Sequence, residues 1–131
     1  MELRRHLRVR AEFSHDAGRA VAFELLTGFD RPTAVVCGND VMAMGVLSAA
    51  VECGLHVPRD LTVIGFDDIA MAGWPMIGLT TVRVDRVGMA TEAVRMLIEQ
   101  IEGGTRVMEY RAPATLVLRS THGPVAEAGR R

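Results

Sequence analysis

The alternation of apolar and polar residues along the chain predicts short strands separated by helices. Residues 7–13 alternate with a period of two, which is typical of a strand with one buried face. Continuous apolar runs predict further strands of the kind that helices cover on both faces, at residues 33–38, 61–66 and 79–84. Shorter strand candidates flank Pro113, at 107–110 and 115–118.

Apolar residues at helical spacing predict helices between these strands. A first helix has Ser14 as its N-cap and ends at Gly28. A second runs from 39 to 53 and is apolar almost all round, which is typical of a helix that is buried or faces another subunit. A third, amphipathic helix covers 85–102, whereas residues 69–78 are too broken by glycine and proline for a full helix.

The order of these elements predicts the fold class. Strands that alternate with helices at ~25–30 residues per unit imply an α/β fold with a doubly wound, mostly parallel sheet. The 131 residues fit one domain, and we expect a flexible tail over 122–131. In such a sheet, ligands bind beyond the carboxyl ends of the strands.

Composition and charge narrow the function classes. A chain that is 49% hydrophobic should fold, and a net charge of −1 argues against binding nucleic acid by bulk electrostatics. We interpret the N-terminal arginines (Arg4, Arg5, Arg8 and Arg10) as a solvated strand edge. No apolar stretch approaches the ~20 residues that a membrane span needs, and no signal peptide opens the chain, so we expect a cytoplasmic protein.

The reactive residue types show no metal or redox pattern. Cys37 and Cys53 lie in apolar segments without paired spacing, which predicts free thiols in a reducing compartment. The four histidines are scattered singly. We therefore expect no metal site and no cofactor.

Three residues follow predicted strands at the edge where ligands bind: Phe13, Asn39 and Asp67. An aromatic ring, a carboxamide and a carboxylate suit a small polyhydroxylated or heterocyclic ligand. The alternative is structural, with Phe13 in the core, Asn39 as a helix cap and Asp67 in a turn. Catalysis by Asp67 and Asp68 is disfavoured, since adjacent residues on an extended segment point to opposite sides.

Several segments in fixed order resemble the effector-binding domain of LacI/GalR-family transcriptional regulators. They are FSHDAG (13–18), PTAVVCGNDVMAMG (32–45), GLHVPRDLTVIGFDDI (54–69) and LTTVR (79–83). The resemblance covers about residues 10–121 of this sequence. It implies the C-terminal subdomain of a type I periplasmic-binding-protein-like fold, whose two α/β subdomains close on a sugar, nucleoside or other small effector.

The resemblance also assigns roles to the site residues. Phe13 matches the aromatic that stacks on the effector, and Asn39 and Asp67 match polar residues that bond to it. Asp40 is at the rim of the site and is expected to hold the loop rather than the ligand. Val84 stands where many sugar-binding members have glutamine, which implies a less polar effector or a weakened site.

Other consequences of the resemblance concern partners. A homodimer is implied, with the interface on Met42, Met44, Met71 and Trp74, although Met42 and Met44 suit a core equally well. DNA would be contacted only through a helix-turn-helix, which this sequence does not contain. An alternative is a solute-binding protein of the same fold.

The resemblance further implies a truncated domain. Residues 1–121 would form part of the effector-binding and dimerisation unit, without the N-terminal subdomain on which the helix at 85–103 packs in the family. We expect weak or no effector binding by the chain alone. We also expect this helix to dock on another copy or to fold back on its own sheet, because a large exposed apolar face favours association.

Overall fold

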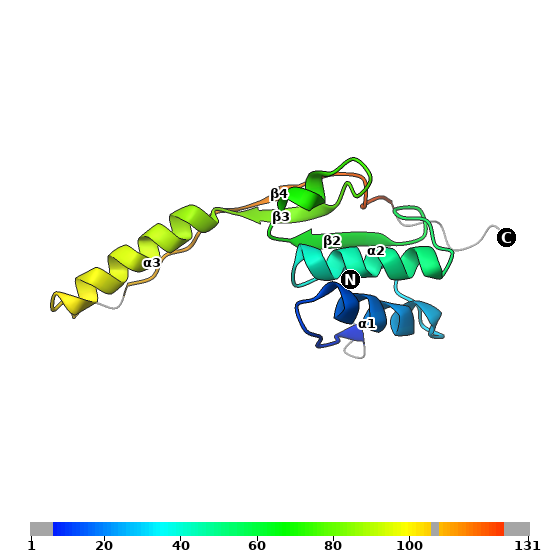
Figure 1. The fold of residues 1–131 in the computed structure, drawn as a ribbon, viewed down its shortest axis with the longest axis horizontal. Helices are drawn as coiled ribbons and strands as arrows, with labels where there is room; N and C mark the ends of the chain where they lie inside the picture. Colours follow the sequence, from blue (N-terminus) through cyan, green and yellow to red (C-terminus); the bar gives the residue numbers. More distant parts are fainter. Residues whose placement is uncertain (1–6, 106–107, 125–131) are drawn as a thin grey trace.

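The sheet of this protein is mostly parallel, with helices stacked on one side. The computed structural model describes residues 7–105 and 108–124. Its elements are α1 His15–Thr27, β1 Ala34–Val36, α2 Asp40–Glu52, β2 Thr62–Phe66, the 3-10 helix η2 Ala70–Gly73, β3 Thr80–Val84, α3 Arg86–Ile101 and β4 Ala114–Val117 (Figure 1). The strand order is β1-β2-β3-β4, with β1, β2 and β3 parallel and β4 antiparallel to β3. The predicted α/β class with a mostly parallel sheet is confirmed.

Helix α2 lies between α1 and the sheet (Figure 1). Its inner residues are fully or almost fully buried, among them Ala43, Val46, Ala49 and Ala50. The two helices approach closely at glycines: a Cβ on Gly45 would lie 2.1 Å from the His15 carbonyl oxygen, and one on Gly18 would lie 2.5 Å from the Met42 carbonyl oxygen. The apolar surface all round α2 is thus explained in large part by burial within the chain.

The predicted helix starts are confirmed by their capping bonds. Ser14 Oγ accepts a bond from the backbone N–H of Ala17 at 3.2 Å, and Asn39 Oδ1 accepts one from Met42 at 2.8 Å. Asp85 Oδ1 accepts one from Gly88 at 2.9 Å. Each cap satisfies an N–H that has no partner within its helix, so the start of the helix is fixed locally.

The prediction of a strand at 7–13 is wrong. Residues 8–12 have no regular secondary structure, and Val9 is 48% exposed. An extended segment becomes a strand only when a neighbour takes its backbone hydrogen bonds, and no strand of the described residues pairs with this one. The candidate at 107–110 is likewise not a strand at 108–110, while residue 107 lies outside the described residues.

The expectation that helices cover both faces of the strand at 33–38 is also wrong. Strand β1 is at the edge of the sheet, and Val36 is 75% exposed. Helices α1 and α2 stack on each other on the same side of the sheet (Figure 1). The burial of β1 alternates, with Ala34 and Val36 exposed on the other face.

Helix α3 extends away from the sheet (Figure 1). Its bounds agree with the predicted 85–102, but within the described part of the chain none of its residues is buried, and Leu97 and Ile101 are 60% and 76% exposed. Only Asp85 separates β3 from α3, so the helix continues outward from the end of the strand. The expectation that α3 folds back on its own sheet is wrong; docking on another copy remains a prediction.

The chain remains attached to the sheet beyond residue 121. His122 Nδ1 lies 3.0 Å from Thr80 Oγ1, and the Gly123 N–H donates to Thr62 Oγ1 at 3.3 Å. The predicted flexible tail therefore does not begin at His122, and its remainder at 125–131 lies outside the described residues. None of the helices in the described ranges is long and apolar enough to cross a membrane.

The two cysteines are free thiols with different environments, and we predict different reactivity. Burial raises the pKa of the Cys37 thiol to about 12, and the nearby Asp40 carboxylate adds to the shift, whereas Cys53 is half-buried at the end of α2. Because the thiolate is the nucleophile, Cys37 should be unreactive at pH 8. Titration with an aromatic disulfide should show one fast thiol per native chain and two after denaturation. A fast phase that persists in Cys53→Ala would contradict this prediction.

Candidate functional site

The carboxyl ends of the parallel strands meet at one edge of the sheet. There, Asp67 directly follows β2, Val84 ends β3, and Asn39 lies just beyond β1. The register pairs Phe66 with Val82, so the residue after β2 lies next to the end of β3. This edge is the predicted place for a ligand.

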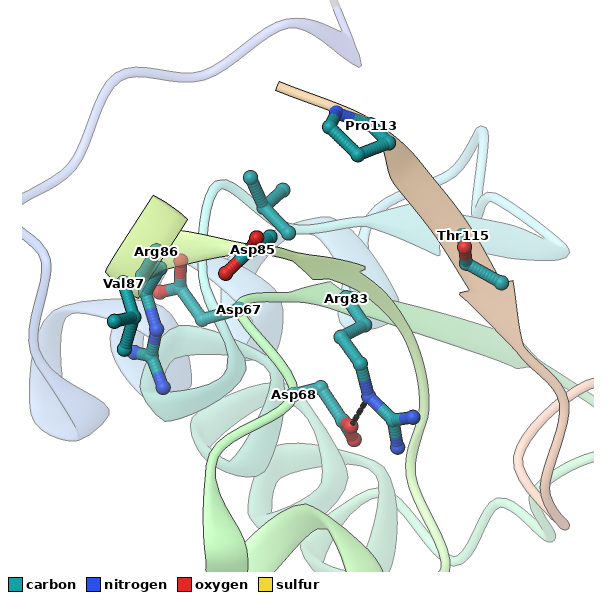
Figure 2. Close-up of a pocket in the computed structure, with 9 residues that line it drawn as sticks. Asp67, Asp68, Arg83, Asp85, Arg86, Val87, Pro113 and Thr115 are labelled. Atoms are coloured by element: carbon teal, nitrogen blue, oxygen red, sulfur yellow. Dashed lines mark hydrogen bonds and ion pairs between the residues drawn. The ribbon is translucent and has the colours of Figure 1, made fainter. Parts of the chain in front are cut away.

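A groove of about 470 Å³ lies at this edge, where β3 passes into α3. It is lined by Asp67 and Val84, to which the resemblance assigned places at the site, and by Asp68, which sequence analysis considered only for catalysis. The other lining residues were missed by sequence analysis, namely Arg83, Asp85, Arg86, Val87, Pro113 and Thr115. Figure 2 shows Asp67, Asp85 and Arg86 gathered near the start of α3, with Arg83 reaching toward Asp68. The lining thus carries three carboxylates and two guanidinium groups around a small apolar surface.

Asp67 is held in an unusual backbone conformation. Its φ is +107°, in the region that favours glycine, and the next residue, Asp68, has a φ of +52°. The Asp67 N–H donates to the Val82 carbonyl oxygen at 2.9 Å, which extends the pairing of β2 and β3 by one residue. Such conformations persist only where the surrounding structure enforces them, and they are frequent at ligand sites.

The Asp68 carboxylate binds two arginines. Its side chain is 7% exposed, and it accepts bonds from Arg83 Nε at 2.5 Å and Arg119 Nη2 at 2.6 Å. Burial alone favours the neutral acid, but the bonds from Arg119 and Arg83 outweigh it and lower the pKa of Asp68. The charged carboxylate therefore fastens the end of β2 to β3 and to the segment after β4.

Asp40 is inside the protein and not at the rim. It is fully buried, accepts a bond from Thr81 Oγ1 at 2.5 Å, and accepts another from the Ile69 N–H at 2.8 Å. The rim position assigned to Asp40 is wrong, whereas its predicted role in holding the loop is confirmed. A carboxylate one residue after the α2 cap thus secures the loop that carries Asp67.

Phe13 and Asn39 lie near each other but outside the groove lining. Phe13 is 71% exposed, and a Cβ on Gly38 would lie 3.0 Å from its ring, which places the ring beside the residue before Asn39. Phe13 is therefore not a core residue. Asn39 caps α2, as the structural alternative predicted. The ligand role of both residues remains a prediction.

The residues of the predicted dimer surface differ in burial. Met42 and Met44 are half-buried on α2, and Met42 packs against the core. Around η2, Met71, Trp74 and Met76 are 38%, 50% and 88% exposed. The core interpretation holds in part for Met42, while the side chains around η2 form an exposed apolar surface.

A chain of polar side chains links α1 and α2, which sequence analysis also missed. His15 Nδ1 lies 3.0 Å from Asp16 Oδ1, and His15 Nε2 lies 3.0 Å from Ser48 Oγ. Ser48 is in mid-helix, outside the groove lining, and donates to the Met44 carbonyl oxygen at 3.1 Å, so it joins helices rather than facing a substrate. Within the described ranges, no group of three or more histidine, cysteine, aspartate or glutamate side chains is placed to hold a metal ion.

Comparison with known proteins identifies the class to which this fold and groove belong. The sequence matches the family of periplasmic binding protein-like domains over residues 2–122. The chain therefore belongs to that family, in the form in which the domain occurs in LacI/GalR-family transcriptional regulators.

Individual relatives agree with this assignment. The HTH-type transcriptional repressor PurR of Yersinia enterocolitica is 39% identical over 99 residues, which are 76% of this chain and 29% of the repressor. A LacI transcriptional regulator from a Rhodococcus species has a TM-score of 0.82 at 37% identity over 91% of this chain and 44% of its own. A LacI-family regulator from Arthrobacter sp. FB24 in complex with lactose has a TM-score of 0.73 at 30% identity, over 86% and 43%. The chain thus spans less than a third of the PurR sequence and under half of these solved chains.

Proposed function

We propose that this chain is the effector-sensing and dimerisation part of a cytoplasmic transcriptional regulator that binds a small polyhydroxylated molecule, such as a sugar or a nucleoside. The observation that carries the proposal is the groove in which Asp67 and Val84 meet Arg83 and Arg86. The lactose complex of the Arthrobacter regulator supports the ligand class.

The chemistry of the groove suits hydroxyl groups. The Asp67 carboxylate accepts bonds from two hydroxyls, and the arginine guanidinium groups donate to hydroxyl or ring oxygens. Val84 and Val87 offer apolar surface to the carbon skeleton of the ligand. Phe13 and Asn39 would contact the ligand from the neighbouring strand end.

Contact with DNA is proposed for the whole regulator and not for this surface. The net charge of −1 gives the chain no excess of cations with which to displace the counterions of a phosphate backbone. A helix-turn-helix elsewhere in the regulator would make that contact, as the name of the Yersinia repressor indicates for that protein. The effector would then act by differential affinity for two conformations of the regulator.

Ligand binding by this chain is expected to be weak and to depend on Asp67. In saturation-transfer NMR, lactose or adenosine should bind with a Kd of about 1 mM, and Asp67→Asn should raise it about tenfold by removing a charge-assisted bond. Asparagine is chosen because it tolerates a positive φ. The matched control is Asp60→Asn in the turn before β2, outside the groove lining, which should leave the Kd unchanged. Equal affinity of the parent chain and Asp67→Asn for lactose or adenosine would contradict the proposed function.

We further propose that the apolar surface around η2, with Met42 and Met44 of α2, forms a homodimer interface. In sedimentation equilibrium the chain should self-associate, and Trp74→Lys should weaken association about tenfold, because a charge would then be buried at the contact. Phe29→Lys, which alters a fully exposed aromatic in the loop between α1 and β1, is the matched control. Leu97→Lys tests separately whether α3 contributes to self-association. An association constant unchanged in Trp74→Lys would eliminate this surface.

A further inference from the structure

The groove and η2 are close along the chain, because only residues 67–69 lie between β2 and η2. Asp67 lines the groove, Asp68 follows it, and Ile69 is the N-cap of η2. The loop is tied at both ends, since the Asp67 N–H donates to Val82 and the Ile69 N–H donates to the buried Asp40. The backbone is therefore held on both sides of Asp68.

Asp68 joins an arginine of the groove to an arginine beside η2. Figure 2 shows Arg83, which lines the groove, reaching from β3 to Asp68, and its side chain is 60% exposed and open to a ligand. On the other side, Arg119 Nη2 bonds to Asp68 and lies 3.7 Å from the place of a Cβ on Gly73, the last residue of η2. Arg119 is itself fixed, because its Nη1 donates to the Leu79 carbonyl oxygen at 2.7 Å.

The turn after η2 is hydrogen-bonded to the segment after β4, which also carries Arg119. The N–H groups of Ile77 and Gly78 both donate to the Trp74 carbonyl oxygen, at 2.9 and 2.8 Å, and the Ser120 N–H donates to the Gly78 carbonyl oxygen at 2.8 Å. Trp74, the only tryptophan in the sequence, is half-exposed at the end of η2. Its indole therefore reports on any movement of this turn.

We propose that Asp68 is a positioning residue that couples the groove to the η2 surface, so that a change in the bonding of Arg83 alters the surroundings of Trp74. The inference rests on the proposed function for its biological meaning. A hydroxylated ligand that takes the hydrogen bond of Arg83 Nε competes with Asp68, which then shifts its bonding toward Arg119. Occupancy of the groove thereby changes the surface proposed for dimerisation, which is a coupling free energy between two sites.

The coupling can be tested without a ligand, by tryptophan fluorescence and amide hydrogen exchange of the whole chain. Arg83→Gln should shift the Trp74 emission maximum and speed exchange at 69–74 about tenfold by weakening local structure. Arg86→Gln, which removes the other arginine of the groove, is the matched control and should leave both readouts unchanged. In an Asp68→Asn background, Arg83→Gln should add no further shift. Arg119→Lys, which weakens the bond to Asp68 together with the bond to the Leu79 carbonyl oxygen, replaces Asp68→Asn if that variant does not fold.

The outcomes separate the coupling from the proposed function. An unchanged Trp74 signal in Arg83→Gln, or an equal shift with and without Asp68, would overturn the coupling. A calorimetric titration with lactose or adenosine then addresses function. If binding heat is accompanied by a change in Trp74 fluorescence, and Asp68→Asn abolishes that change, both proposals are supported. If the unmodified chain gives binding heat without a change in Trp74 fluorescence, only the coupling is refuted. If either compound binds Asp67→Asn as well as it binds the parent chain, the proposed function fails, and the fluorescence of the variants still decides the coupling.

Discussion

Replacing Gly45 with alanine is expected to destabilise the protein by about 3 kcal/mol, because the contact between α1 and α2 has no room for a methyl group. The added Cβ would lie 2.1 Å from the His15 carbonyl oxygen and 2.6 Å from the Arg19 amide nitrogen. Both are backbone atoms of α1, so no side chain is able to move aside, and the helices must separate. The loss is large against a typical total stability of about 5–15 kcal/mol.

Chemical denaturation of the purified chain measures this change, and Gly28→Ala provides the matched control. Gly28 follows α1, its φ is −70°, and the nearest atom to its Cβ lies at 3.4 Å. That substitution is expected to stay within about 0.5 kcal/mol of the parent, or to stabilise slightly by restricting the unfolded chain. If Gly45→Ala were as stable as Gly28→Ala, the close approach of the two helices would be refuted.

The helices of this protein were predictable because their signals are local. Ser14, Asn39 and Asp85 each accept a capping bond from the N–H three residues further on, and such bonds depend little on the rest of the chain. The strand predicted at 7–13 is wrong because strand formation is not local. Its alternating pattern was present, but a strand requires a partner, and the period of a sequence does not say where one lies.

The candidate site was predictable only where a residue follows a strand directly. Asp67 and Val84 come together because parallel strands end at one edge, which follows from the order of strands and helices along the chain. Thr115 enters the groove only because β4 pairs antiparallel with β3, with Thr115 opposite Arg83. The link from Asp68 to Arg119 spans 51 positions in the sequence and carries no local signal.

Asp40→Ala is expected to cost about 3–5 kcal/mol and to loosen the loop that carries Asp67. The fully buried carboxylate accepts bonds from the Ile69 N–H and the Thr81 hydroxyl, and alanine would leave both donors without their acceptor. Asp40→Asn retains one acceptor oxygen and should lose about half as much. The control is Asp16→Ala in the first turn of α1, where the side chain is 96% exposed and the loss should stay below about 1 kcal/mol.

Denaturation of these variants gives the energies, and hydrogen exchange at Ile69 shows where the structure loosens. Exchange at that amide should accelerate in both Asp40 variants and remain unchanged in Asp16→Ala, since the Ile69 N–H donates to Asp40. If Asp40→Ala proved as mild as the control, the carboxylate would not be the anchor of the loop. Because the same carboxylate follows the α2 cap directly, its loss should disturb the edge near Asn39 and the Asp67 loop together. We therefore expect both the stability of this part of the fold and the geometry of the groove to depend on the Asp40 side chain.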